Sequence, residues 1–206
     1  MRRAVRTSVL RSGAVLASIV LTVAAHELPG GPYLAWCSLV PLFWALRAPS
    51  AFARAALGFV YGVGVTALLS DGLVHALHFN LNVPEGLAWG AITAGYAGLL
   101  GSFSAMFAVL LGAPSPAALA PLATAGLFTC VEWLRGHAFI GFPFALHGHT
   151  QHAQLWLIQI ADLGGVYAVS FVLVLVNAAL LSWWMGDLPI GMRTRVISGV
   201  AATVLA

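Results

Sequence analysis

The sequence contains no lysine, and only 7% of its 206 residues are charged. With 61% hydrophobic residues, it has too little charge to keep the surface of a soluble domain hydrated. The formal net charge of +3 is small and gives no reason to expect binding to nucleic acid. The two cysteines, Cys37 and Cys130, both lie in apolar runs. Their wide separation argues against a disulfide framework or a metal knuckle. Both cysteines are better interpreted as small hydrophobic side chains.

What remains is a chain of long apolar runs, which predicts an all-α, polytopic transmembrane helical bundle of about seven spans, the last incomplete. We expect one domain over residues 1–206. The predicted spans are 14–25 with a start as early as Thr7, 33–46, 55–70, 87–112, 117–133, 166–185, and a run from 196. A short interfacial helix is expected at residues 153–162, before Gly164 and Gly165 break the sixth run. The basic N-terminus also fits a signal peptide, although the spans that follow favour an uncleaved helix.

Arginine placement predicts the orientation of the bundle. If the N-terminus is cytoplasmic, eight of the nine arginines lie on that side and only Arg135 lies opposite, as the positive-inside rule requires. This count needs the short second run to cross the membrane. All seven histidines then fall in or beside the outer loops.

Small residues predict where helices pack. Gly58, Gly62 and Gly64 give the third span a small face, and the fourth span repeats small residues every four positions at 90, 94, 98 and 102. Such residues allow helix backbones to approach closely in lipid.

Residues 132–152 form a polar, aromatic and histidine-rich island between apolar runs. Glu132 and Arg135 are three residues apart and would share one helix face. They could form a local salt bridge, or Arg135 could reach a lipid phosphate or a partner loop. Phe142 and Phe144 flank Pro143 in a turn that suits either an interfacial anchor or a substrate-contacting loop.

Histidines His147, His149 and His152 suggest a metal site, as do His75 and His78, because imidazole binds zinc, copper and nickel. No cysteine joins them, and loop histidines are often solvated, so we expect neither metal nor cofactor. The chain also lacks the nucleophile and phosphate-binding motifs of common enzymes, so no catalytic residue is expected.

The island and its flanks resemble apolipoprotein N-acyltransferase. The matching segments are 132–136 (EWLRG), 141–144 (GFPF), 148–151 (GHTQ), 161–167 (ADLGGVY) with Asn177, and 36–43 (WCSLVPLF). They cover nearly the whole chain, but only the N-terminal membrane part of that family.

The resemblance implies a bacterial inner-membrane protein with residues 135–162 as a periplasmic loop. Family members transfer an acyl chain from a phospholipid to the N-terminal diacylglyceryl-cysteine of lipoproteins, through a thioester on a cysteine. That cysteine, with a Glu and a Lys, belongs to a periplasmic nitrilase-like domain after the seventh span. A chain without lysine cannot hold this set, so a truncated or split enzyme is expected, with a separate nitrilase-like chain as one source of the chemistry.

The resemblance also gives lipid- or substrate-contacting candidates, which are Glu132, Arg135, Phe142, Phe144, His149 and Gln151. Phe144 stands where the family usually has Trp, and His149 where it usually has Tyr. The expected partners are a phospholipid acyl donor, a diacylglyceryl-lipoprotein and membrane lipids. Two other functions stay open: a non-catalytic membrane scaffold that recruits a partner, and a histidine-dependent metal carrier.

Overall fold

A computed structural model describes residues 2–91, 95, 97–112, 118–138, 141, 143–188, 191 and 198 of the protein. These residues form helices and turns, with no strand among them, which confirms the all-α prediction. The elements in chain order are α1 (Arg2–Glu27), α2 (Gly31–Leu34), α3 (Val40–Ala45), α4 (Ala51–Leu69), α5 (Asp71–Leu81), α6 (Glu85–Ala91), α7 (Gly98–Leu110), α8 (Ala120–His137), the 3₁₀ helix η2 (His147–Gln151), α9 (Leu155–Ile158), α10 (Ala161–Gly164) and α11 (Val166–Met185).

Three helices in the described part of the chain are long and apolar enough to cross a membrane. They are Arg6–Glu27 within α1, Ala51–Leu69 (α4) and Val166–Met185 (α11). The bounds of α11 agree with the predicted sixth span, because Gly165 and Gly186 have positive φ and mark its two ends. The count of about seven spans stays a prediction, and the run from 196 lies outside the described residues except for Ser198.

The predicted second span is not one continuous helix. Residues 33–46 contain the end of α2, a series of turns and then α3, which has only six residues. Non-helical backbone is tolerated at membrane depth only where other protein groups satisfy its polar atoms. Ser18 does so for part of this segment, since its hydroxyl donates to Ser38 O and accepts from the Leu42 amide.

Helices α4 and α7 pack closely through small residues, which agrees with the predicted type of contact. A Cβ added to Gly58 would lie 2.6 Å from Ser104 O, and one added to Gly62 would lie 2.8 Å from the Cα of Gly101. The predicted face of the fourth span was wrong, because Gly90 and Gly98 have open space around them. The residues of α7 that meet Gly58 and Gly62 are instead Ser104 and Gly101. They are three positions apart and share one face, because a helix repeats every 3.6 residues.

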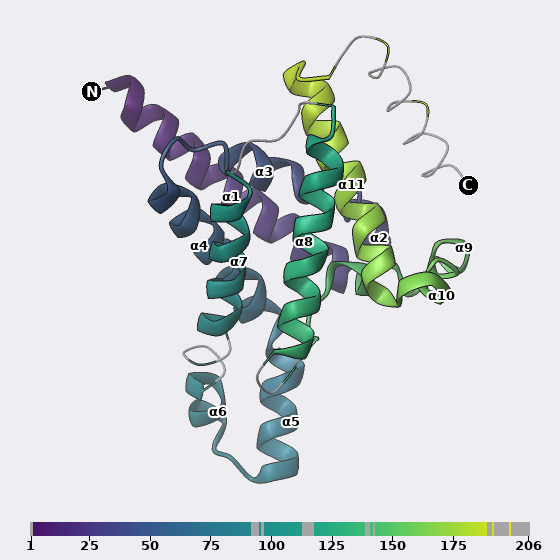
Figure 1. The fold of residues 1–206 in the computed structure, drawn as a ribbon. Helices are drawn as coiled ribbons and strands as arrows, with labels where there is room; N and C mark the ends of the chain where they lie inside the picture. Colours follow the sequence, from purple (N-terminus) through teal and green to yellow (C-terminus); the bar gives the residue numbers. More distant parts are fainter. Residues whose placement is uncertain are drawn as a thin grey trace.

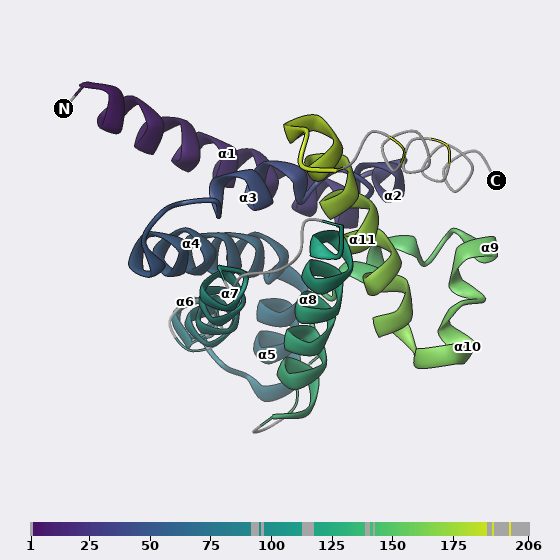
Figure 2. The same cartoon turned by 45° about the horizontal axis from the view of Figure 1, so that its top comes forward.

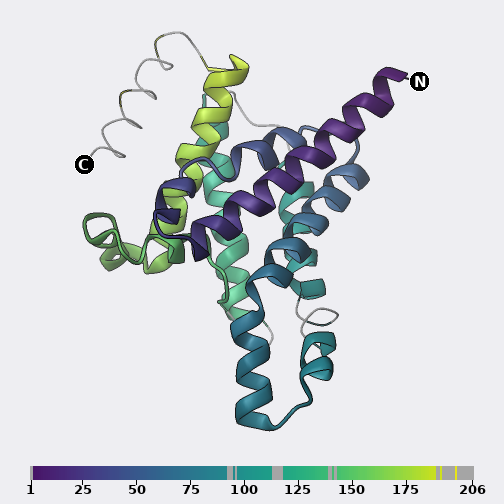
Figure 3. The same ribbon diagram turned by 180° about the vertical axis from the view of Figure 1, so that it is seen from behind.

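The bundle is assembled around a core shared by α1, α3, α4, α7, α8 and α11. Figure 2 shows α1 and α3 lying across one side of the bundle, with α8 and α11 side by side. Figures 1 and 3 show α5 and α6 extending away from this core as an arm. The arm has its own small contact between Val74 and Ala88.

The chain between α8 and α11 departs from the prediction in two ways. Helix α8 continues to His137, so the loop predicted at 135–162 starts later. Where one interfacial helix was predicted at 153–162, the chain forms two four-residue helices, α9 and α10, within a short apolar helical segment, Leu155–Gly164. They project from the bundle (Figure 1), and Leu155 and Leu163 are 69% and 88% exposed.

Candidate functional site

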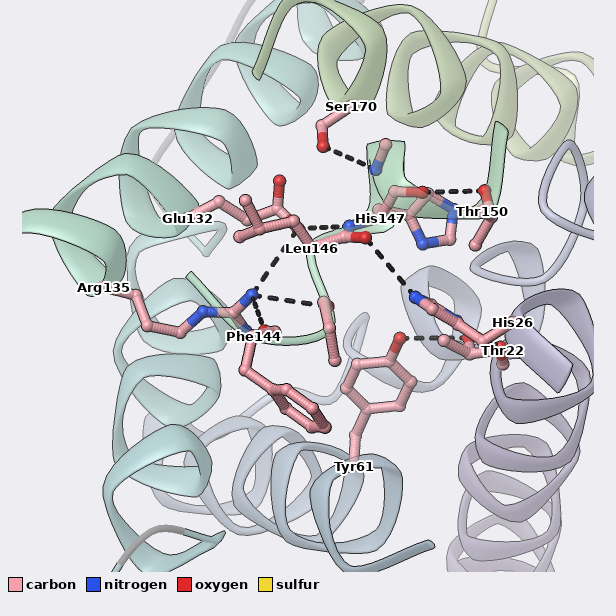
Figure 4. A network of polar contacts seen from close by, with 12 residues as sticks. Thr22, His26, Tyr61, Glu132, Arg135, Phe144, Leu146, His147, Thr150 and Ser170 are labelled. Carbon is pink, nitrogen blue, oxygen red and sulfur yellow. Dashed lines mark hydrogen bonds and ion pairs between the residues drawn. The ribbon is translucent and has the colours of Figure 1, made fainter. Parts of the chain in front are cut away.

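Polar side chains from distant parts of the chain meet at the end of α8 that carries Glu132 (Figure 4). We call this end of the bundle the His-rich end, after His147, His149 and His152. Helix α1 contributes Thr22 and His26 to it, and α4 contributes Tyr61. Most of these groups are buried, so their hydrogen bonds determine how the segment after α8 folds back onto the bundle.

Glu132 joins α8 to η2. Its Oε1 accepts a hydrogen bond of 2.8 Å from the backbone amide of His147, and Glu132 is only 4% exposed. Arg135 Nη2 lies 3.9 Å from the same oxygen, which is an ion pair but too long for a hydrogen bond. The predicted pair therefore exists, while the closer partner of the carboxylate is the backbone of His147.

Arg135 fixes the turn before η2. Its Nη2 donates to Phe144 O at 3.0 Å and to Ala145 O at 3.4 Å. Ala145 has φ of +50°, a left-handed conformation that costs an alanine about 1 kcal/mol. The guanidinium stabilises this unfavourable backbone because both carbonyl oxygens point toward it.

Helix α1 closes the site from the other side. Thr22 Oγ1 and the Tyr61 hydroxyl form a 3.1 Å hydrogen bond, which links α1 to α4. The Nδ1 of His26 lies 2.8 Å from Thr22 O, and its Nε2 lies 3.4 Å from Leu146 O. A neutral imidazole can donate to only one of these carbonyls.

Side chains of the site also form hydrogen bonds with the backbone of the interrupted second apolar run. His147 Nε2 and Asn177 Nδ2 both donate to Ala35 O, at 3.2 Å and 2.8 Å. Asn177 Oδ1 accepts from the Leu39 amide at 2.8 Å. Gln151 Nε2 donates to Pro32 O at 2.8 Å. Side chains from η2 and α11 therefore satisfy backbone groups of α2 and of the segment between α2 and α3.

Two hollows meet at this site, and Ala145 lines both. The inner cavity has a volume of about 50 Å³, enough for a few water molecules. Its polar side is formed by Thr22, Tyr61, Glu132, Arg135 and His147, and its apolar side mainly by residues of α3, α4, α7 and α8. The second hollow is an open cleft of about 260 Å³ lined by His26, Glu27, Leu69, Pro143, Phe144, Ala145 and His149.

The two histidines of η2 differ in their surroundings. Burial, together with the charge of His26, lowers the pKa of His147 to about 4. Partial burial and the charges of His26 and Arg135 lower the pKa of His149 as well. Both imidazoles are therefore neutral at pH 7, and His147 can serve as a neutral donor inside the fold.

The structure brings most of the predicted site residues together. Glu132 and Arg135 line the inner cavity, and Phe144 and His149 line the open cleft. Gln151 is fully buried and bonded to protein groups, while Phe142 lies outside the described residues. Contact with lipid or substrate stays a prediction for all six.

The sequence did not predict that Thr22, Tyr61 and Ser170 belong to the site. Ser170 Oγ accepts a hydrogen bond from the Gly148 amide at 2.8 Å. Their only signal was a small polar or hydroxyl-bearing residue inside an apolar run.

The histidines do not assemble into a metal site within the described part of the chain, where no group of three His, Cys, Asp or Glu side chains could hold a metal ion. The His147 ring faces Ala35 O, and His152 Nδ1 is bonded to His149 O at 3.2 Å.

Comparison with known proteins identifies the family. Residues 17–179 match the profile of the apolipoprotein N-acyltransferase N-terminal domain. The chain belongs to this family. It is 31% identical over 202 residues to the apolipoprotein N-acyltransferase of Geobacter metallireducens, covering 92% of this chain and 34% of the relative. It is 32% identical over 178 residues to apolipoprotein N-acyltransferase 2 of Treponema pallidum, covering 84% and 30%.

The chain thus spans about a third of the length of these N-acyltransferase relatives. The family and the apolar helices together make it a membrane protein. The family match covers Glu132, Arg135, His147 and Asn177, so the polar site lies within the domain that defines the family.

Proposed function

We propose that this chain is the membrane portion of a lipoprotein N-acyltransferase, and that it positions two lipidated substrates for chemistry carried out elsewhere. The substrates are a phospholipid acyl donor and the N-terminal diacylglyceryl-cysteine of a lipoprotein. The chemistry belongs to a nitrilase-like portion outside residues 1–206, in the same polypeptide or in a separate chain. The family match over residues 17–179 carries this proposal.

The geometry of the His-rich end supports a role in positioning substrates. The open cleft has a volume of about 260 Å³ and places His26 and His149 beside the apolar Leu69 and Phe144. The charged Glu132 and Arg135 lie next to it, in the smaller inner cavity. An amphiphile has the same division between an apolar chain and a polar head. Binding energy gained here would serve to orient the reacting groups, which can supply much of a rate enhancement.

The proposal includes the membrane placement. The protein lies in the bacterial inner membrane with a cytoplasmic N-terminus, about seven spans and a periplasmic His-rich end. Single-cysteine labelling tests this orientation in a background in which Cys37 and Cys130, both exposed, are replaced. His152→Cys should react with an impermeant maleimide from outside the cell, whereas Phe52→Cys, at a position 84% exposed, should react only after permeabilisation. The reverse pattern contradicts the placement.

A chimera tests the function. The corresponding N-terminal third of the Geobacter metallireducens relative is replaced by residues 1–206, and conversion of a diacylated to a triacylated lipopeptide is followed by mass spectrometry. We expect the chimera to acylate the lipopeptide, and residues 1–206 alone to show no turnover. Turnover by the isolated chain contradicts the division of labour.

The same chimera separates the proposal from a membrane scaffold. Arg135→Gln in the chimera should lower kcat/KM about tenfold or more, because the turn at Phe144 and Ala145 loses its donor. Arg6→Gln, an exposed arginine on α1, is the matched control and should leave activity unchanged. A chimera that inserts and folds but stays inactive would favour a scaffold.

A further inference from the structure

Three arginines gather at the end of the bundle opposite Glu132, around the connection from α3 to α4. Arg11 Nη2 donates to Arg47 O at 3.3 Å. Arg54 Nη1 donates to Ala48 O at 3.0 Å. Two helices, α1 and α4, thus bring guanidinium groups to consecutive carbonyls of one short segment. We call Arg11, Arg47 and Arg54 the arginine cluster.

The cluster keeps an excess of positive charge. Arg47 pairs with Asp187, with Nη1 2.6 Å from Oδ2, and no other acidic side chain among the described residues forms an ion pair with these arginines. Three arginines against one aspartate leave a formal charge of +2. Each guanidinium has five N–H donors, and the buried Nε groups of Arg11 and Arg54 have no acceptor in the described part of the chain.

An apolar cleft opens beside the cluster. It has a volume of about 190 Å³, and its lining includes Phe43, Arg47, Leu111, Ala120, Leu181 and Asp187. The ion pair of Arg47 and Asp187 therefore stands at its polar rim, with side chains 45% and 36% exposed. The guanidinium of Arg54 packs against Gly112, the residue that follows Leu111 of the cleft lining.

Aromatic side chains mark the depth of this cleft in a membrane. Trp183 and Trp184, in the last turn of α11, are 41% and 64% exposed, shortly before Asp187. Exposed tryptophans are enriched where a membrane protein meets the headgroup layer. A cleft at this depth would face a lipid phosphate on its polar side and an acyl chain on its apolar side.

We propose that the arginine cluster and its cleft bind one anionic phospholipid, with the phosphate on the arginines and part of an acyl chain along Phe43, Leu111 and Leu181. The inference rests on the membrane placement proposed above, although not on acyl transfer. A lipid fits better than a free anion, because the cleft is apolar and continues directly from the charged rim. Basic pockets between helices on the cytoplasmic side commonly bind anionic headgroups.

Lipid titration of the purified protein in detergent tests the proposal, with bound lipid counted by native mass spectrometry. The probes are dioleoylphosphatidylglycerol, dioleoylphosphatidylcholine and inorganic phosphate. We expect the anionic lipid to bind at least tenfold more tightly than the zwitterionic one, and inorganic phosphate neither to bind measurably nor to displace it.

Charge variants give effects of opposite sign. Each arginine near an anionic headgroup contributes about fivefold in affinity, so Arg11→Gln with Arg47→Gln should weaken phosphatidylglycerol binding about 30-fold. Asp187→Asn removes the competing carboxylate and should strengthen it about fivefold. Arg6→Gln removes the same charge from α1 outside the cluster and should change affinity by less than twofold.

A cleft variant tests the acyl chain. Ala120, in the first turn of α8, is partly exposed, so Ala120→Trp should fill the cleft without unfolding the bundle, as checked by a monodisperse elution profile. It should weaken phosphatidylglycerol binding at least fivefold. Equal affinity for both lipids, an equal loss in Arg6→Gln, or displacement by inorganic phosphate would each overturn the site. The topology and chimera experiments report separately on the proposed function.

Discussion

Glu132 Oε1 accepts a 2.8 Å hydrogen bond from the backbone amide of His147, so a side chain near the end of α8 holds the first residue of η2. Fourteen residues separate the two along the chain, and the turn between them contains the left-handed Ala145. The contact therefore decides where the whole segment 143–151 lies against the bundle.

Two substitutions of Glu132 test whether the hydrogen bond that its Oε1 accepts from the His147 amide stabilises the fold. Glu132→Gln keeps a carbonyl oxygen for the His147 amide and should cost less than about 1 kcal/mol, whereas Glu132→Leu leaves this buried amide unpaired and should cost about 2 kcal/mol. Thermal unfolding in detergent measures both. Equal losses in the two variants would mean that the hydrogen bond does not stabilise the fold.

The low pKa of His147 predicts a loss of stability in acid. Since its pKa falls from 6.5 to about 4 on folding, the unfolded chain binds more protons than the native one between these values. Stability is therefore complete above pH 6.5 and decreases as pH falls toward 4, by roughly 3 kcal/mol in total.

The measurement is the unfolding midpoint as a function of pH. His147→Gln should flatten this slope, whereas the matched control His152→Gln, at an exposed position, should keep it. A wild-type midpoint that does not change between pH 6.5 and 4 contradicts the prediction.

Asn177 should be among the most sensitive positions of α11. It is fully buried and bonds to Leu39 N, Ala35 O and Leu173 O, each at 2.8 Å. Asn177→Leu leaves backbone groups of the broken second span without these partners and should destabilise the protein by about 3 kcal/mol. Asn80→Leu, an exposed position on α5, should change the unfolding midpoint little.

Close packing of α4 on α7 predicts a contrast between two glycines. Gly58→Ala would place a Cβ 2.6 Å from Ser104 O and should cost about 1–3 kcal/mol. Gly98→Ala meets no atom within 4 Å and should be neutral or stabilising, because alanine is the better helix former. Unfolding in a denaturing detergent compares the two, and similar losses would contradict close packing of α4 on α7 at Gly58.

Much of the architecture could be predicted because local pattern determines it. The run that became α11 is apolar throughout and has Gly165 and Gly186 at its ends, so both its type and its bounds followed from sequence. The second run failed as a single helix for a tertiary reason. Its break is stabilised by Asn177 and Ser18, which lie in other helices.

The contacts of the candidate site also include some that the sequence predicts and others that depend on the fold. The pairing of Glu132 with Arg135 follows from their spacing on one helix. The partners that matter more, the His147 amide and the carbonyls of Phe144 and Ala145, depend on how the chain returns after α8. No sequence pattern predicts that Thr22 and Tyr61 belong to the site. A single hydroxyl in an apolar helix becomes a site residue only when another helix places a hydrogen-bonding partner beside it.

Residue order and composition were enough to predict an all-α chain whose composition suits lipid, and its motifs indicated its family. Both depend on residue order and on hydrophobicity, which are local properties. Three features depend on how the helices pack: the break in the second apolar run, the face of α7 that meets α4, and the meeting of polar groups from α1, α4, α8 and η2 around one cavity. In an apolar environment each buried polar group must find a partner, and that partner is usually distant in the chain.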